Sequence, residues 1–478
     1  MAACLFIIFS FSRASFRALN EKDRMKSVPR ADDRGRKGTD RAKVWRGGGS
    51  ALDWRKLERD LIDIRRDLHR YPEAAWTEFR TSSLIAERLE RLGCKPGVGL
   101  DTVETSAVMG RPSEEEIDRH IGRAVTQGGN LAWIEAMRRY PGVVAVLDTG
   151  RPGPVVSLRF DIDCVEVDED TSPDHRPARE GFASVNPHLM HACGHDAHTA
   201  IGLGVAEVLT AREGLLNGTV RLIFQPGEEG CRGAYAMTRK GVVDGADYFL
   251  AMHIGGGVPS GTFGLNSLGY LRTTKLDAHF TGRPAHAAGA PHEGRNALLA
   301  AATAALGLHA IAPHRDGAMR VNVGVLNAGT GRNVIAEHAD MKVETRGENQ
   351  EIADYVYARA VEVLNGAAAM YGTTVELVKA GAGTTASGDE DLVARAKESV
   401  LALNCFREVV DTVRAGGSED ATWMMRRVQE QGGRATYMAL GSDITAPHHN
   451  GRFDLDERSI IQGVRAVAAI TEGLLSSK

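Results

Sequence analysis

Residues 219–230 read Thr-Val-Arg-Leu-Ile-Phe-Gln-Pro-Gly-Glu-Glu-Gly. The first six form a short, mostly apolar run rich in residues that favour strands, which predicts a buried strand. Pro226 and Gly227 end this strand, and two adjacent carboxylates, Glu228 and Glu229, follow at once. In α/β folds, ligands collect at the carboxyl ends of the strands. The segment therefore predicts an α/β sheet with a polar site at its edge.

The sequence on both sides of this segment alternates between strands and helices. Short apolar runs bounded by Gly or Pro predict strands at 143–147, 155–160 and 247–254, and helical periodicity predicts a helix at 197–209. This alternation indicates a layered α/β architecture, in which helices flank the sheet.

A module of a different kind follows. Between residues 275 and 378 the pattern predicts strand, helix, strand, strand, helix and strand, the order of a ferredoxin-like α+β unit. The Gly-rich stretch 380–388 is a candidate hinge back to the first domain. We therefore predict one domain formed by residues 51–268 and 385–478, with a second domain, residues 269–384, inserted into it.

The composition excludes several classes of protein. The 478 residues are 43% hydrophobic and 25% charged with a formal net charge of -4, so the basic excess of a nucleic-acid-binding protein is missing. No apolar run approaches the ~20 residues that span a bilayer. The six scattered cysteines predict reduced thiols and a cytoplasmic location. Residues 1–50 predict a disordered extension, with a targeting segment as the alternative.

Residues 191–198, His-Ala-Cys-Gly-His-Asp-Ala-His, are the strongest sign of chemistry. They lie where a loop enters the predicted helix at 197–209. Thiolate and imidazole are ligands that borderline-soft divalent metals favour, and a Cys-x-His pair can reach one ion from adjacent loop positions. A helix cap needs one Asp, whereas this segment carries three His and a Cys. It predicts a metal site, in which Asp196 or His198 orients a ligand.

Further candidates stand at the ends of predicted strands. One of Glu228 and Glu229 can bind a metal while the other takes a proton from water, because side chains alternate in direction along extended chain. The alternative for this pair is a solvated acidic turn. His253 ends a strand, where a lone His is more often a core residue. Of Asp161 and Asp163, one is expected to orient a metal ligand, and the alternative is a capping role.

Other reaction classes lack their signatures in this sequence. Zinc deaminases need His-x-Glu followed by Cys-x-x-Cys, and neither pattern is present. The Gly-x-Ser-x-Gly turn of serine hydrolases and the lysine-containing phosphate-binding loop are also missing.

Taken together, these segments resemble the M20 metallopeptidase family, in particular its amidohydrolase branch of N-acyl-amino-acid and auxin-conjugate hydrolases. The resemblance extends from about residue 53 onward. It implies a zinc-exopeptidase-like catalytic domain, with the inserted domain acting as a lid and dimerisation domain. The motifs that carry it are HACGHDAHTA from His191, GEEG from Gly227, AMHI from Ala251, GSEDAT from Gly417 and HNGRFDLDE from His449.

The resemblance also implies roles for individual residues. It implies two divalent ions, zinc or manganese, with Glu228 as general base and acid. Asp163 would orient a ligand, and Asp161 would not bind metal. The implied metal ligands are Cys193, His195, Glu229, His253 and His449.

In the inserted domain, the resemblance implies that three residues contact the substrate. His286, in Pro-Ala-His-Ala, would reach the active site of a partner subunit, while Asn333 and Arg346 would hold a substrate carboxylate. The alternative for Arg346 is a local ion pair with Glu344 or Glu348.

The implied reaction is hydrolysis of the amide bond of an N-acyl amino acid. A closer resemblance implies p-aminobenzoyl-glutamate as the substrate, cleaved to p-aminobenzoate and glutamate. The lid would pair with a homologous B subunit or in a homodimer. The alternatives are another N-acyl amino acid or a dipeptide as substrate, or an inactive metal-binding partner subunit. The closer resemblance rests on the inserted segment 106–133, LDTGRPGPV from Leu147, FASVNPHLMHACGHD from Phe182 and VETRG from Val343.

Overall fold

The computed structural model describes residues 52–476. The predicted extension, residues 1–50, lies outside the described residues. Within 52–476, none of the helices has the length and apolar character needed to cross a lipid bilayer.

The larger of the two main sheets is mixed, as the sequence predicts for the α/β part. Its order is β1-β2-β4-β3-β5-β14-β6-β12. The four central strands run parallel, whereas β1 and β2 on one side and β6 on the other join by antiparallel pairs. In sheet order the strands are β1 (Lys95–Val98), β2 (Val143–Asp148), β4 (Thr219–Gln225), β3 (Val155–Asp161), β5 (Tyr248–Ile254), β14 (Arg434–Leu440), β6 (Thr262–Gly264) and β12 (Glu408–Val410).

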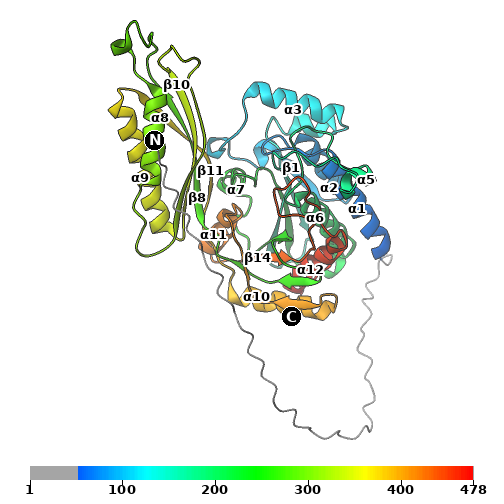
Figure 1. Cartoon of the computed structure of the whole chain (residues 1–478). Helices are drawn as coiled ribbons and strands as arrows, with labels where there is room; N and C mark the ends of the chain where they lie inside the picture. The colour runs from blue at the N-terminus through cyan, green and yellow to red at the C-terminus, as the bar shows by residue number, and fades with distance from the viewer. Residues whose placement is uncertain (1–51, 477–478) are drawn as a thin grey trace, which may run out of the picture. The chain divides into compact units, whose positions relative to one another are not determined.

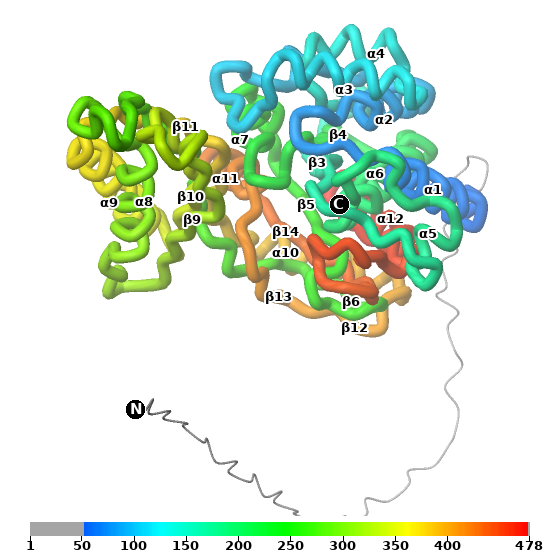
Figure 2. The backbone as a smooth tube through the Cα atoms, turned by 45° about the horizontal axis from the view of Figure 1, so that its top comes forward, coloured from blue at the N-terminus to red at the C-terminus, as the bar shows by residue number. Residues whose placement is uncertain are grey.

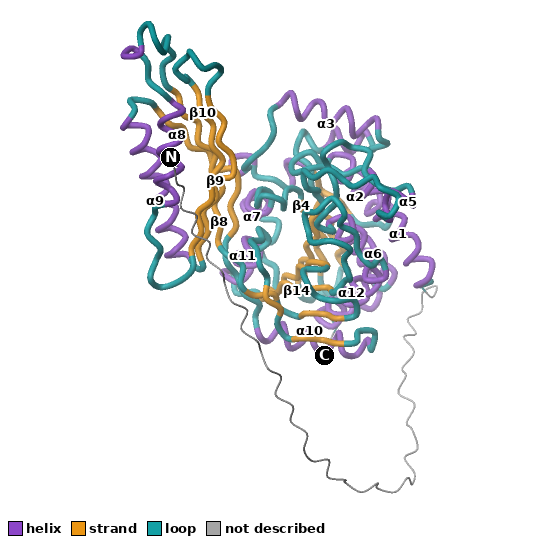
Figure 3. Tube along the Cα trace, in the orientation of Figure 1, coloured by secondary structure: helices purple, strands orange, loops and turns teal. Residues whose placement is uncertain are grey.

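Helices cover both faces of this sheet because its central strands are apolar on both sides (Figure 3). Leu222 and Phe224 of β4 face one helical layer, and Ile223 faces the other. The first layer contains α1, α6 and α12, which lie side by side (Figure 1, Figure 2). The helices of the first layer are α1 (Trp54–Arg70), α2 (Phe79–Arg91), α6 (His195–Ala211), α10 (Glu390–Leu403) and α12 (Arg458–Leu475), and those of the second are α7 (Ala234–Lys240) and α11 (Thr422–Glu430).

The inserted segment 106–133 contains a helix with a clear start signal. Ser113 accepts a hydrogen bond from the backbone of Glu116, and the Glu116 carboxylate accepts one from the backbone of Ser113. This reciprocal cap satisfies two free N–H groups at the start of α3 (Glu114–Thr126). A short helix, α4 (Leu131–Ala136), follows it.

The second main sheet has four antiparallel strands in the order β11-β8-β10-β9. Along the chain the elements follow the predicted order of strand, helix, strand, strand, helix and strand. Both helices cover the same face of the sheet, where a separate apolar core forms (Figure 1). We call this unit the lid; its elements are β8 (Arg272–Thr281), α8 (Ala297–His309), β9 (Met319–Ala328), β10 (His338–Gly347), α9 (Gln350–Met370) and β11 (Thr374–Gly383).

The predicted hinge at 380–388 begins too early. Strand β11 continues to Gly383, past a shift in its pairing with β8 between Lys379 and Gly381. The backbone N–H of Ala382 donates to the carbonyl of Cys231, at 2.8 Å. These bonds satisfy the backbone in spite of the glycines, so the end of β11 is a paired strand. The precise domain limits remain a prediction.

We expect α6 to tolerate no side chain at Gly202. A Cβ atom there would lie 2.7 Å from ring atoms of both Phe160 and Phe224. Gly202→Ala should therefore lower the free energy of unfolding by about 1–3 kcal/mol, measured by chemical denaturation. The control is Gly366→Ala, at an exposed position of α9 with open space around it, which should gain up to about 1 kcal/mol. A similar loss in both variants would contradict this packing argument.

Candidate metal centre

The predicted metal ligands, together with Glu228 and Asp163, come from five separate segments that meet at one edge of the large sheet. Glu228 and Glu229 follow β4, His253 lies in β5 and Asp163 follows β3. These three strands are parallel, so their carboxyl ends share an edge. The segment from Cys193 to the first turn of α6, and the loop before α12, complete the site.

The five predicted ligands lie close together. Cys193, His195 and His253 form one group, and Cys193, Glu229 and His449 form a second, with the donor atoms of each group within 4.8 Å of one another. The Cys193 Sγ atom lies 3.4 Å from His253 Nε2, and His449 Nε2 lies 3.1 Å from a Glu229 oxygen. Because Cys193 belongs to both groups, the two groups adjoin, and together they would hold two neighbouring cations.

Hydrogen bonds determine which nitrogen of two histidines faces this cluster. His195 Nδ1 lies 2.9 Å from the carbonyl of Asp163, and His253 Nδ1 lies 2.8 Å from the carbonyl of Ile254. A carbonyl only accepts, so Nδ1 carries the proton in both rings and Nε2 keeps its lone pair. The buried Nε2 of His195 has no hydrogen-bond partner among the described residues. An unpaired imidazole nitrogen beside a thiol and carboxylates fits a divalent metal.

A glycine makes the turn between Cys193 and His195 possible. Gly194 has φ +92°, a left-handed conformation that strains other residues. A Cβ atom on Gly194 would also lie 2.6 Å from a side-chain carbon of Ile254. The turn therefore brings the thiol and the imidazole to the same cluster and packs tightly on β5.

Asp163 holds the Glu228–Glu229 turn in place. Its carboxylate accepts hydrogen bonds from the backbone N–H groups of Glu228, at 3.0 Å, and Glu229, at 2.9 Å. Its carbonyl accepts the bond from His195 described above. One residue thus orients an imidazole and two carboxylates.

The two adjacent carboxylates have different environments. Burial, together with the charge of Glu419, raises the pKa of Glu228 well above that of an ordinary glutamate. Burial acts the same way on Glu229, but the hydrogen bond with His449 and the charge of His195 outweigh it and lower the pKa. Opposite shifts in neighbouring carboxyl groups are typical of an acid–base residue beside a permanently charged one.

His198 contacts the cluster by packing. Its Nε2 accepts from the backbone N–H of Ile254, at 2.8 Å, so Nδ1 is the nitrogen that donates to Asp161. Its ring stacks on His195 with 5.4 Å between centroids and meets His253 edge-on at 4.7 Å. With both nitrogens used, His198 orients two predicted ligands without being one.

Asp196 differs from the prediction. Its carboxylate lies 2.8 Å from both Arg65 Nε and His69 Nδ1, and it forms none of its hydrogen bonds or ion pairs with the predicted metal ligands. The reason is helical geometry, because adjacent residues of α6 project about 100° apart, so Asp196 points away from the cluster that His195 faces.

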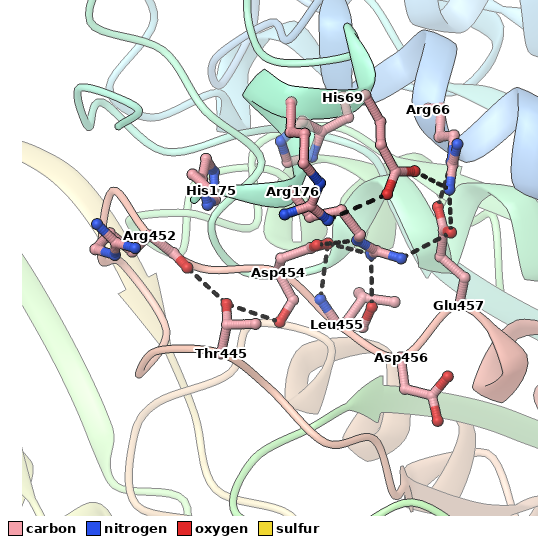
Figure 4. A network of polar contacts seen from close by, with 12 residues as sticks. Arg66, His69, His175, Arg176, Thr445, Arg452, Asp454, Leu455, Asp456 and Glu457 are labelled. Carbon is pink, nitrogen blue, oxygen red and sulfur yellow. Dashed lines mark hydrogen bonds and ion pairs between the residues drawn. The ribbon is translucent and has the colours of Figure 1, made fainter. Parts of the chain in front are cut away.

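Asp196 belongs instead to a buried network, which it joins through Arg65. The network holds the segment that follows His449, where Arg66 pairs with Glu457 (Figure 4). Arg65 forms ion pairs with Asp454, at 3.1 Å, and with Glu457, at 3.3 Å. Arg176 also pairs with Asp454 and Glu457. The network therefore connects α1 and the start of α6 to the residues just before α12.

Sequence reasoning missed a second buried network behind Glu228. The fully buried Arg159 of β3 donates to Asp161 at 2.7 Å, Glu419 at 3.0 Å and Asp420 at 3.3 Å. Tyr437 donates to the other oxygen of Glu419. The sequence did contain a sign of this network, because Arg159 lies within an apolar strand and a buried charge needs partners of opposite charge.

The lid residues divide into two sets. Arg346 lines the cavity of the cluster, which has a volume of about 420 Å³, and makes two hydrogen bonds to Glu344, at 2.9 and 3.0 Å. His286 and Asn333 are exposed and do not line this cavity. They neighbour each other, since the Ala287 N–H donates to the Asn333 carbonyl.

A mixed α/β sheet with thiol, imidazole and carboxylate donors at its carboxyl edge defines a metallohydrolase. Residues 157–473 match the model of peptidase family M20/M25/M40, and the chain belongs to this family. It is an amidohydrolase of the M20 type.

Two curated relatives are similar over most of their length. The chain is 51% identical to indole-3-acetyl-aspartic acid hydrolase from Enterobacter agglomerans, over 87% of this chain and 95% of the relative. It is 50% identical to the A subunit of p-aminobenzoyl-glutamate hydrolase from Escherichia coli, over 85% of this chain and 94% of the relative.

Solved structures agree with the fold. An aminobenzoyl-glutamate utilization protein from Klebsiella pneumoniae superposes with a TM-score of 0.76 at 43% identity, over 88% of this chain and 96% of that one. A dinuclear metal-binding M20 peptidase from Bacillus subtilis has a TM-score of 0.59 at 25% identity, over 88% and 99% of the two chains.

We expect Arg159→Met to destabilise the protein strongly. It leaves three buried carboxylates without their cation, which should cost about 3–5 kcal/mol in the free energy of unfolding. The control is Arg427→Met, which breaks a half-exposed pair with Asp244 and should leave the free energy of unfolding nearly unchanged. Chemical denaturation measures both, and comparable losses would refute the role given to Arg159.

Proposed function

We propose that the chain cleaves N-acyl amino acids at a pair of divalent metal ions, with Glu228 as the proton-transfer residue. The observation that carries the proposal is the pair of donor groups that share Cys193 and lie beside Glu228 in one cavity. The metal-holding residues would be Cys193, His195, Glu229, His253 and His449.

The donor set suits zinc best, because thiolate and imidazole are soft ligands, although its carboxylate also suits manganese. Ions bound there would supply Lewis acidity to the amide carbonyl and bring the pKa of a water molecule towards neutrality.

The chain's own residues then perform the proton transfers. Glu228 accepts a proton from the attacking water and returns it to the departing amine. The Asp163 carboxylate holds the backbone of Glu228, so this base is fixed in position before the substrate arrives. The ion pair between Arg346 and Glu344, which the sequence offered as the alternative, is present. In the proposed complex Arg346, which lines the cavity, exchanges this partner for the substrate carboxylate, which its planar guanidinium suits.

The proposed substrate is p-aminobenzoyl-glutamate, supported by the Escherichia coli relative and the Klebsiella pneumoniae structure. Indole-3-acetyl-aspartate is a second candidate, favoured by the relative with 51% identity. Both compounds join an aromatic acyl group to an acidic amino acid. The cavity meets this chemistry with three cations, Lys275, Arg346 and Arg414.

The assembly is also part of the proposal. His286 and Asn333 are exposed on the lid and do not line the cavity of their own chain, which suits a role in a partner's active site. The partner would be a homologous B subunit or a second copy of this chain. A cytoplasmic location follows from the pattern of cysteines.

Two variants should separate metal binding from proton transfer. Glu228→Gln should keep its bound metal and lose turnover by about 100- to 10,000-fold, because only the base is removed. His253→Ala should lose metal as well, because it removes a ligand. Metal content by elemental analysis and turnover by amine release measure the two effects. Equal metal loss in both variants would refute the division of roles.

A substrate panel tests the function itself. The metal-loaded chain, alone and with a B subunit, is assayed on p-aminobenzoyl-glutamate, indole-3-acetyl-aspartate, N-acetyl amino acids and a dipeptide. We expect the highest kcat/KM for p-aminobenzoyl-glutamate. A preference for a different compound would revise the substrate. Loss of all turnover under every condition would favour an inactive partner subunit, although Glu228 and all five candidate ligands are present.

A further inference from the structure

A second cavity adjoins the candidate metal centre. It has a volume of about 340 Å³, and Lys275 lines both cavities, so they share a wall. One side of it is the lid sheet, and the other is formed by residues near α3 and just after the Glu228–Glu229 turn. We call it the basic cavity, and its charged lining residues are Arg111, Arg232, Lys275, Lys342, Asp277 and Glu344.

Strand alternation explains why the lid contributes charges here. Along β8, Leu276 packs into the apolar core under α8 and α9, while Lys275 and Asp277 point to the opposite, helix-free face. The register places Lys275 opposite Glu344 and Asp277 opposite Lys342 on β10. The lid therefore supplies two cations and two carboxylates, whose charges balance.

The catalytic side of the cavity adds positive charge. Arg111 is paired with Glu114. Arg232 donates only to the carbonyl of Gly110, at 3.4 Å, and among the described residues it has no carboxylate within 4 Å. Its guanidinium lies against Gly230, where a Cβ atom would come within 2.6 Å of Arg232 Nε. Gly230 thus leaves room for the side chain of Arg232, next to the turn that carries Glu228 and Glu229. Among the described residues, this arginine has no anionic partner.

We propose that the basic cavity binds the side-chain carboxylate of an acidic amino acid in the substrate, through Lys275 and Arg232. The inference rests on the proposed function, and it deepens that function by naming residues that determine specificity. Arg346 holds the α-carboxylate in the metal-centre cavity, and the side chain of the same amino acid extends past Lys275 to Arg232. A carboxylate gains charge-assisted hydrogen bonds there, which a neutral amide of the same shape does not.

The test compares two substrates that differ in one group, p-aminobenzoyl-glutamate and p-aminobenzoyl-glutamine. Lys275→Met and Arg232→Met should each lower kcat/KM for the glutamate compound by about 10- to 100-fold, mainly through KM, because a charged hydrogen bond is lost. In Arg232→Met, turnover of the glutamine compound should stay within about threefold, since Arg232 does not line the metal-centre cavity and the groups that hold the metals and move the proton are untouched.

A matched control comes from the same sheet. Lys379 on β11 lies over the ring of Tyr357 in α9, at 4.9 Å, and lines neither cavity. Lys379→Met should leave the ratio of the two kcat/KM values unchanged. Thermal unfolding of all three variants establishes that they are folded.

The outcomes separate this inference from the proposed function. Suppose that both compounds are cleaved, and that Lys275→Met and Arg232→Met leave the ratio of kcat/KM for the glutamate compound to kcat/KM for the glutamine compound unchanged. The proposed specificity site is then wrong, and the proposed function stands. If neither amide is cleaved, the proposed function fails for this substrate class. In that case, calorimetry measures the binding of free glutamate and free glutamine and tests the specificity site by itself. If the wild type and both variants bind glutamate with equal affinity, the proposed specificity site is wrong.

Discussion

The hydrogen bonds of Asp163 are the interaction on which the site depends most. Its carboxylate binds two consecutive backbone N–H groups in the turn after β4, and its carbonyl binds the imidazole of His195 in α6. Three segments that are distant along the chain are therefore aligned by one residue. Because it is buried, these bonds are not exchanged for bonds to water, and the alignment exists before any ligand binds.

Two charged networks support this alignment from behind. One contains Arg159 and lies under Glu228, and the other contains Arg65 and holds the loop before α12. Each places a buried arginine among several carboxylates, an arrangement that is costly to desolvate and costly to break. The consequence is rigidity around the metal centre. The lid contributes Arg346 and Lys275 to the cavity from its helix-free face.

The local sequence was sufficient to predict an element where its hydrophobic pattern was long. It was also sufficient to predict the site where motifs follow strands that end at one edge of the sheet. The predicted helix at 197–209 lies within α6 (His195–Ala211) because its apolar pattern is continuous, and the predicted ligands converge because parallel strands end together. Short strands such as β6 and β12 have three residues each, too few for a period to show. Arg159 and Glu419 are 260 residues apart in the sequence, so no local pattern predicts their contact. The side chain of Asp196 does not face the cluster, because residues that are adjacent in the sequence point in different directions on a helix.

The metal centre joins donors of very different sequence separation. Cys193 and His195 share a single turn, whereas His449 arrives from a loop whose anchor, Arg65 with Glu457, closes a span of 392 residues. A polypeptide emerging from the ribosome therefore presents a thiol and an imidazole long before it can complete their coordination. A cation captured by these two proposed ligands would have open positions and would exchange readily, so the choice between competing ions would be made only when the loop of His449 docks.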